Sequence, residues 1–132
     1  MNYLLDTHTF LWASFSPAKL SAKAAKVIRA ADHRIYLSTV SFWEVSLKYG
    51  LGKIELENCT PEGLPNLATQ MGFEIIQPTA QESASSYQLP KTHHKDPFDR
   101  MIVWQAIRQS MVLISKDTKL PEYERFGLKV FW

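Results

Sequence analysis

The stretch Tyr3-Leu4-Leu5-Asp6, near the start of the chain, decides the fold class. Its three apolar residues end abruptly at a carboxylate, which is typical of a buried strand followed by a polar turn. Four further segments of similar length, each mostly apolar, follow later in the chain. We therefore predict strands at residues 3–5, 34–38, 73–76, 111–115 and 128–131.

Helical patterns separate these strands. Ser21 has the position of an N-cap, because apolar residues follow it at helical spacing. Further helices are predicted at 39–51, at 60–71 with a shortening or bend at Pro65, at 79–89, and from Pro97 onward. Strands that alternate with helices predict a parallel sheet covered on both faces. We expect one α/β domain over residues 1–132, with a mostly parallel sheet of four to five strands.

Composition narrows the class of protein. Hydrophobic residues make up 45% of the chain and charged residues 21%, which is typical of a globular protein rather than a disordered one. The net charge is only +2, so a nucleic-acid partner would be held by local basic patches. The single cysteine, Cys59, fits a reducing compartment. Because the sequence shows neither an export signal nor an apolar run of roughly 20 residues, we expect a cytoplasmic protein and no membrane span.

Acidic residues fall at one edge of the predicted sheet. Asp6 directly follows the first strand, and Asp117 lies two residues after the fourth. Glu44 stands in the first turns of the helix after the second strand, so it starts from the same edge. Ligands of parallel α/β sheets bind outside the carboxyl ends of the strands. We expect these three carboxylates to share one cleft.

Asp96 and Asp99 stand at the start of the helix that leads into the fourth strand. We expect this helix to begin at the opposite edge of the sheet, so that the loop 90–95 must bring the chain back. Asp96 is either a helix N-cap or a metal ligand, since a helix N-terminus favours a carboxylate by about 0.3–1 kcal/mol. Asp99 lies one turn later on the same helix face, where it can point into the cleft beside Asp6.

Several carboxylates in one cleft repel one another. A like-charged pair about 4 Å apart costs roughly 4 kcal/mol at an effective dielectric constant of 20. A hard divalent cation removes this repulsion, and Mg²⁺ typically takes one or two carboxylates together with water and substrate phosphates. No His/Cys set has the spacing of a zinc site. The acids therefore indicate Mg²⁺-dependent phosphoryl chemistry.

Four motifs in order resemble those of the PIN-domain nucleases, and among them the VapC-type toxins of bacterial toxin–antitoxin pairs. The motifs are Leu4-Leu5-Asp6-Thr7-His8, Ser41-Phe42-Trp43-Glu44, His94-Lys95-Asp96-Pro97-Phe98-Asp99-Arg100 and Ser115-Lys116-Asp117. The resemblance covers essentially the whole chain. It implies a three-layer α/β/α domain and an endoribonuclease that uses Mg²⁺ or Mn²⁺. It also implies a homodimer and a small cognate antitoxin protein that blocks the site.

Carried over residue by residue, the resemblance implies that Asp6 and Asp99 bind the metal directly. Glu44 and Asp117 are the remaining acids, acting directly or through water, and Asp96 is an additional acid of a subgroup. Thr7 is a candidate for hydrogen bonding to one of the carboxylates. We expect a metal-activated water to attack the scissile phosphate of an RNA substrate in line.

Basic residues beside the motifs are candidates for contacts with RNA phosphates. We single out three of them: Arg100, Lys95 and Lys116. Arg100 has an alternative role, in which it pairs with an acid and holds it in place. For His93 and His94 we favour a solvated loop over a role as general acid or phosphate ligand. For His8 we favour packing or hydrogen bonding beside Asp6.

Single positions exclude two other Mg²⁺-binding folds. A haloacid-dehalogenase-type phosphatase needs a second Asp two residues after the first, and His8 stands there. A response-regulator receiver domain needs an acid after the third strand, which here ends Ile76-Gln77-Pro78. The remaining alternative is a catalytically inactive PIN-like module that binds RNA or protein. Such modules typically lack part of the acid set, whereas this chain retains it.

Overall fold

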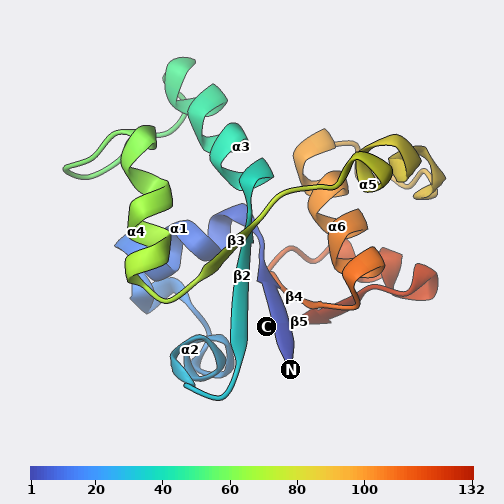
Figure 1. The fold of residues 1–132 in the computed structure, drawn as a ribbon, viewed down its shortest axis with the longest axis horizontal. Helices are drawn as coiled ribbons and strands as arrows, with labels where there is room; N and C mark the ends of the chain where they lie inside the picture. The colour runs from blue at the N-terminus through green and yellow to red at the C-terminus, as the bar shows by residue number, and fades with distance from the viewer.

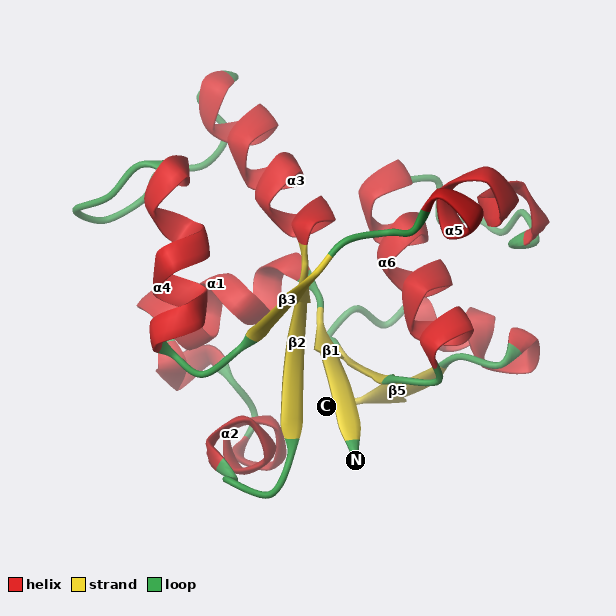
Figure 2. Ribbon diagram, in the orientation of Figure 1, coloured by secondary structure: helices red, strands yellow, loops and turns green.

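Five parallel strands form one sheet, with helices on both of its faces (Figures 1 and 2). The computed structural model describes residues 1–132 throughout. The strands are β1 (Asn2–Leu5), β2 (Arg34–Ser38), β3 (Glu74–Ile76), β4 (Val112–Ile114) and β5 (Lys129–Phe131). Each bound lies within one residue of the predicted range. The three-layer α/β/α architecture is confirmed.

Six α-helices connect the strands. They are α1 (Thr7–Phe15), α2 (Ala22–Arg29), α3 (Thr39–Gly50), α4 (Leu64–Gln70), α5 (Ala80–Ser85) and α6 (Pro97–Gln109). Ser21 caps α2 as predicted, and Thr79 caps α5 in a capping box. Pro65 lies in the first turn of α4, which is shorter than the predicted range. None of the helices has the length and apolar character that crossing a membrane requires.

Helix α1 corrects the prediction that a polar turn follows Asp6. The carboxylate of Asp6 is the N-cap of this helix, because its Oδ1 accepts a hydrogen bond from the amide of Thr9 at 2.8 Å. The helix is rich in Thr and aromatic residues of modest helix propensity, so the sequence pattern hides it. Burial of Phe10 supplies the stability that propensity does not. The sequence also gives no sign of the 3₁₀ segment Leu120–Phe126 between β4 and β5.

Alternate residues of each strand point to opposite faces of the sheet and build two cores. Leu4 packs with Ile102 of α6 in one core, whereas Tyr3 and Leu5 pack with Phe10 of α1 in the other. Figure 1 shows α1, α2 and α4 on one side of the sheet and α5 and α6 on the other. Because β1 is buried on both faces, its sequence is a continuous apolar run rather than an alternating one.

The strand order β3-β2-β1-β4-β5 creates a switch point between β1 and β4. The chain steps outward from β1 to β2 and β3, and then returns to the other side of β1 for β4 and β5. Parallel sheets bind ligands outside the carboxyl ends of the strands where the order reverses. The amide of Asp6 donates to the carbonyl of Ile114 at 3.3 Å, so the segments that follow β1 and β4 begin side by side.

Helix α6 begins at this same edge, which corrects the expectation that it starts at the opposite one. A crossover helix runs antiparallel to the parallel strands that it joins. A helix that leads into β4 therefore starts at the carboxyl edge, and the loop 90–95 does not have to carry the chain back. Asp99 of α6 consequently lies near Asp6 and Asp117, whose negative charges raise its pKa.

Candidate active site

Asp6 is held from two directions at the end of β1. The amide of Thr9 donates to Oδ1, and the hydroxyl of Ser115 donates to Oδ2. Ser115 also accepts a hydrogen bond from the amide of Asp117 at 3.1 Å, so this one hydroxyl links two of the predicted site acids. Burial raises the pKa of Asp6 above its usual value, although these hydrogen bonds and the nearby His8 lower it in part. Ser115 thus has a positioning role that the sequence analysis did not assign.

Glu44 is almost fully buried on α3 and is held by hydroxyl groups and one cation. The hydroxyl of Thr7 donates to its Oε1 at 2.6 Å, and Ser41 lies 2.9 Å from the same hydroxyl. Its other oxygen forms an ion pair with Lys48, one turn later on the helix. Partial burial opposes the charge of Lys48, but the hydrogen bond and charge of Glu44, with the charges of Asp96 and Asp99, raise its pKa overall. The sequence analysis did not single out Lys48, although its position four residues after Glu44 on a predicted helix is the spacing that favours such a pair.

Asp96 and Asp99 both lie at the start of α6, where Asp96 caps the helix and Asp99 lies among the other acids. Oδ1 of Asp96 accepts from the amides of Phe98 at 2.9 Å and Asp99 at 3.1 Å, so the N-cap role is present. A metal-ligand role remains compatible with it, because one ligand atom from each of Glu44, Asp96 and Asp99 lies within 4.8 Å of the others. Burial first, and then the charges of the four other acids, raise the pKa of Asp99 to about 7.

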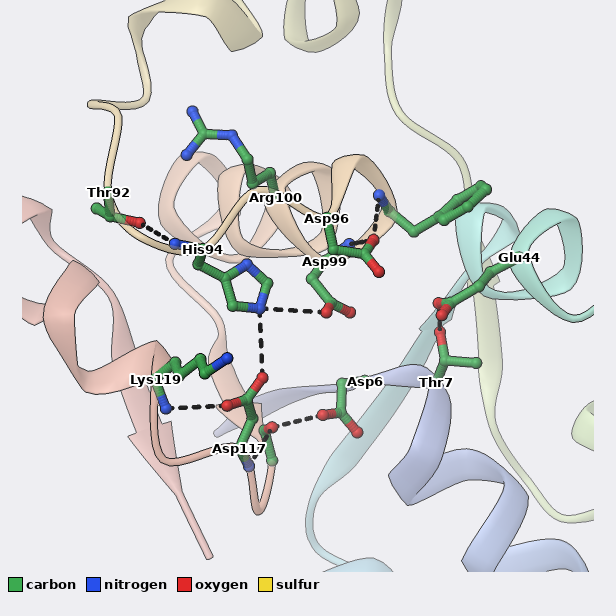
Figure 3. A network of polar contacts seen from close by, with 12 residues as sticks. Asp6, Thr7, Glu44, Thr92, His94, Asp96, Asp99, Arg100, Asp117 and Lys119 are labelled. Atoms are coloured by element: carbon green, nitrogen blue, oxygen red, sulfur yellow. Dashed lines mark hydrogen bonds and ion pairs between the residues drawn. The ribbon is translucent and has the colours of Figure 1, made fainter. Parts of the chain in front are cut away.

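His94 is buried beside the acids, which corrects our preference for a solvated loop. Its side chain is only 6% exposed, and its Nε2 lies 3.3 Å from oxygens of both Asp99 and Asp117 (Figure 3). The loop that carries it is held by Thr92, whose hydroxyl accepts from the amide of His94 at 3.1 Å. His94, Asp99 and Asp117 make up a second group of atoms within 4.8 Å of one another.

Arg100 points away from the acids in Figure 3 and has a third role, different from the two considered from sequence. Its guanidinium donates to the carbonyls of Leu89 at 2.8 Å and Pro90 at 3.2 Å, and to the hydroxyl of Tyr123 at 3.0 Å. The same tyrosine hydroxyl donates to the carbonyl of His94 at 3.4 Å. Arg100 therefore fixes the loop that places His94 among the carboxylates.

A pocket of about 430 Å³ opens between the ends of β1 and β4, and Asp6, Asp99 and Asp117 contribute to its wall. These three acids come from three separate segments of the chain, as the sequence predicted, whereas Glu44 does not line the pocket and lies beside Asp99 instead. Ser and Thr hydroxyls orient these carboxylates without neutralising them. Their remaining oxygen atoms are hard ligands, and a cation at the cluster would offset the charges of the acids that, together with burial, raise the pKa of Asp99. The residues present therefore fit a divalent cation.

The sequence profile of the PIN domain family matches residues 3–125. This chain belongs to the PIN domain family. The PIN domain is 31% identical over 117 residues to Ribonuclease VapC22 of Mycobacterium tuberculosis, a match that covers 89% of this chain and 88% of that protein.

Solved structures show that the fold is shared widely. The PIN domain superposes with a TM-score of 0.72 on a chain of VapBC2 from Rickettsia felis bound to a promoter DNA fragment, at 19% identity over 100% of this chain and 99% of that one. It superposes with a TM-score of 0.68 on a chain of VapBC-1 from nontypeable Haemophilus influenzae, at 17% identity over 99% and 97% of the two chains. At these identities the likeness establishes the fold alone.

Replacing Asp99 should stabilise the metal-free protein at high pH. The folded-state pKa of about 7 lies above the unfolded value of about 3.9, so the stability from this group is lost as pH rises through 7. In EDTA at about pH 8, Asp99→Asn should raise the free energy of unfolding by about 1–3 kcal/mol. Solvent screens part of the repulsion on this carboxylate, because its side chain is partly exposed. The gain should shrink toward about pH 4. The exposed Asp32→Asn is the control for urea unfolding, and a gain that is independent of pH would contradict this view of the cluster.

Arg100→Lys should destabilise the fold because a lysine cannot reproduce three hydrogen bonds from one planar group. The loss leaves buried carbonyls without donors, so we expect a cost of about 2–3 kcal/mol in the free energy of unfolding. Arg29→Lys, on the exposed face of α2, should stay within about 0.5 kcal/mol of the unsubstituted protein. Unchanged stability in Arg100→Lys together with weaker RNA binding would instead make Arg100 a phosphate contact.

Proposed function

We propose that this PIN domain is an endoribonuclease that hydrolyses RNA phosphodiester bonds with Mg²⁺, or Mn²⁺, at its acid cluster. The observation that carries the proposal is the convergence of acids at the switch point of the sheet: Asp6, Asp99 and Asp117 line one pocket, and Glu44 lies beside Asp99. The relative in Mycobacterium tuberculosis bears the name of a ribonuclease. The complete acid set argues against an inactive binding module.

Asp6 and Asp99 are the direct metal ligands in this proposal, and Glu44, Asp117 and Asp96 complete the negative surroundings. A bound divalent cation supplies Lewis acidity, which activates water at neutral pH and offsets charge that develops on the phosphate. Thr9 and Ser115 keep the carboxylate of Asp6 in place. Thr7 and Lys48 do the same for Glu44, so that little reorganisation is needed when substrate binds.

Lys95 and Lys116 are the cations that we assign to the RNA backbone. Both side chains are exposed, and each lines a pocket beside the acids. Lys116 shares the pocket of Asp6 and Asp117, whereas Lys95 lies with His94 in a neighbouring pocket of about 430 Å³. Phosphates on either side of the cleaved bond would meet one lysine each. We do not assign Arg100 to the RNA backbone, because its guanidinium already donates hydrogen bonds to Leu89, Pro90 and Tyr123.

We further propose that the protein is a cytoplasmic toxin which a cognate antitoxin inhibits, and that it forms a homodimer. Structural neighbours with the same fold carry the names of VapBC pairs. Trp43 and Leu47 of α3 and Leu51 directly after it form an exposed apolar stripe, with 65%, 46% and 61% of their surface exposed. A stripe of this kind supports a protein partner that covers it.

Removal of one ligand should separate catalysis from folding. Asp6→Asn and Asp99→Asn should each lower the kcat for cleavage of RNA in Mg²⁺ by at least about 100-fold, because each loses a group that holds the cation. Both variants should retain the circular dichroism spectrum of the folded protein. Asp32→Asn is the matched control, and activity in either site variant comparable to that control would contradict the assignment.

Mg²⁺ should also raise the melting temperature of the unsubstituted protein, since an ion that binds only the folded state stabilises it by mass action. The shift should grow with Mg²⁺ concentration and disappear in Asp6→Asn. Differential scanning fluorimetry with and without EDTA measures it. A melting temperature indifferent to Mg²⁺, with no RNA cleavage, would favour the inactive binding module.

A further inference from the structure

We propose that His94, Asp99 and Asp117 bind a first-row transition-metal ion, with the Nε2 atom of His94 as a nitrogen ligand. The inference rests on the proposed function, because both carboxylates belong to the same site. It goes beyond that function by adding an imidazole to a set of ligands otherwise made of carboxylates. It also predicts that the site distinguishes transition-metal ions from Mg²⁺.

The imidazole of His94 points into the acid cluster (Figure 3). Its Nε2 lies 3.3 Å from Oδ2 of Asp99 and 3.3 Å from Oδ2 of Asp117. Its Nδ1 is buried and has no hydrogen-bond partner. The two carboxylates are therefore the only polar contacts of a ring that is 94% buried, with 6% of the side chain exposed.

The distances around Nε2 suit a shared ion better than hydrogen bonds. A charged N–H···O⁻ hydrogen bond typically measures about 2.7–2.9 Å, and one N–H cannot point directly at two oxygens. Metal–ligand bonds of about 2.0–2.2 Å at angles near 90–110° place neighbouring ligand atoms roughly 3.0–3.5 Å apart. Both separations from Nε2 fall in this range. The ligand atoms of all three residues lie within 4.8 Å of one another, so small side-chain movements close the set around one ion.

The fold holds the imidazole in place before any ion binds. The hydroxyl of Thr92 accepts from the amide of His94, and the hydroxyl of Tyr123 donates to its carbonyl. The ring of Tyr123 also packs edge-to-face on the imidazole, with centroids 6.3 Å apart. Arg100 donates to the same tyrosine hydroxyl. A ligand with a fixed orientation binds a metal ion with little reorganisation.

The nitrogen atom decides which ions this position favours. Imidazole suits ions such as Zn²⁺ and Ni²⁺, whereas carboxylates and water suit Mg²⁺. The other group of clustered atoms, from Glu44, Asp96 and Asp99, offers oxygen alone. Asp99 belongs to both groups, and the proposed function assigns it to Mg²⁺. The ion held by His94 therefore adjoins the Mg²⁺ position and shares a carboxylate with it.

The first test compares two ions by calorimetry. Metal-free protein without a histidine tag is titrated with Co²⁺ alone and with Mg²⁺ alone. His94→Gln keeps an amide that can donate to the carboxylates but removes the imidazole nitrogen. We expect this variant to raise the Kd for Co²⁺ at least about 10-fold, while the Kd for Mg²⁺ stays within about threefold.

His93→Gln is the matched control, because His93 is the exposed neighbour of His94. This variant should leave the Kd for both ions unchanged. If folded His94→Gln changes the Kd for both ions equally, or leaves the Kd for Co²⁺ unchanged, the proposal is wrong.

The second test detects the nitrogen ligand directly. X-ray absorption at the zinc edge, with one equivalent of Zn²⁺, should show imidazole scattering in the unsubstituted protein and none in folded His94→Gln. The chain has four histidines, so replacing His8, His33 and His93 together by glutamine leaves His94 alone. This triple variant should keep the imidazole signal, and it tests the proposal even where His94→Gln does not fold. Zn²⁺ bound without imidazole in the triple variant would overturn the assignment.

Failure of this inference is distinguishable from failure of the proposed function. RNA cleavage in Mg²⁺, with Co²⁺ and Zn²⁺ binding independent of His94, would remove the nitrogen ligand and leave the endoribonuclease. Binding of Co²⁺ and Zn²⁺ through His94, without RNA cleavage in Mg²⁺, would confirm the ion site and contradict the endoribonuclease.

Discussion

Mutual repulsion among the carboxylates at the carboxyl edge of the sheet is the constraint on which the rest of the structure depends. The strand order brings the ends of β1 and β4 together, and α3 and α6 add acids from both sides. The cost is concentrated at Asp99, the acid common to both groups of clustered atoms. A fold can hold such a cluster only if its packing elsewhere is strong, and here β1 is buried in two cores, one on each face.

Neutral hydroxyl donors explain how the acids are positioned without losing their charge. Ser115 donates to Asp6 and Thr7 donates to Glu44, and neither hydroxyl cancels the negative potential of the pocket. Lysine or arginine in these places would satisfy the carboxylates but would compete with a cation. Lys48 is the exception, since it pairs with the almost fully buried Glu44. The cluster is thus ordered before it binds a cation, and it remains attractive to one.

The strands and the convergence of the acids were predictable from the sequence, because a buried parallel strand is a continuous apolar run and its end is a fixed edge. Helix α1 was not, because its stability comes from the Asp6 cap and the burial of Phe10 rather than from its own pattern. The environment of His94 was predicted from its position in a polar loop, and that of Arg100 from its position beside an acid at a helix start. Their actual environment depends on Tyr123, which lies far along the chain in a 3₁₀ segment that no sequence signal marked.

The segment from Asp96 to Arg100 shows how much one helix start can do, since successive helical residues point about 100° apart. Asp96 caps α6, and Pro97 occupies the first turn, where a missing N–H costs nothing. Phe98 turns into the core, Asp99 turns to the acids, and Arg100 turns back to hold the loop of His94. A shift of one residue would rotate every one of these side chains away from its partner. The close spacing of this motif is therefore a consequence of helix geometry, in which the cap, the core, the site and the loop are each served by a different face of the same turn.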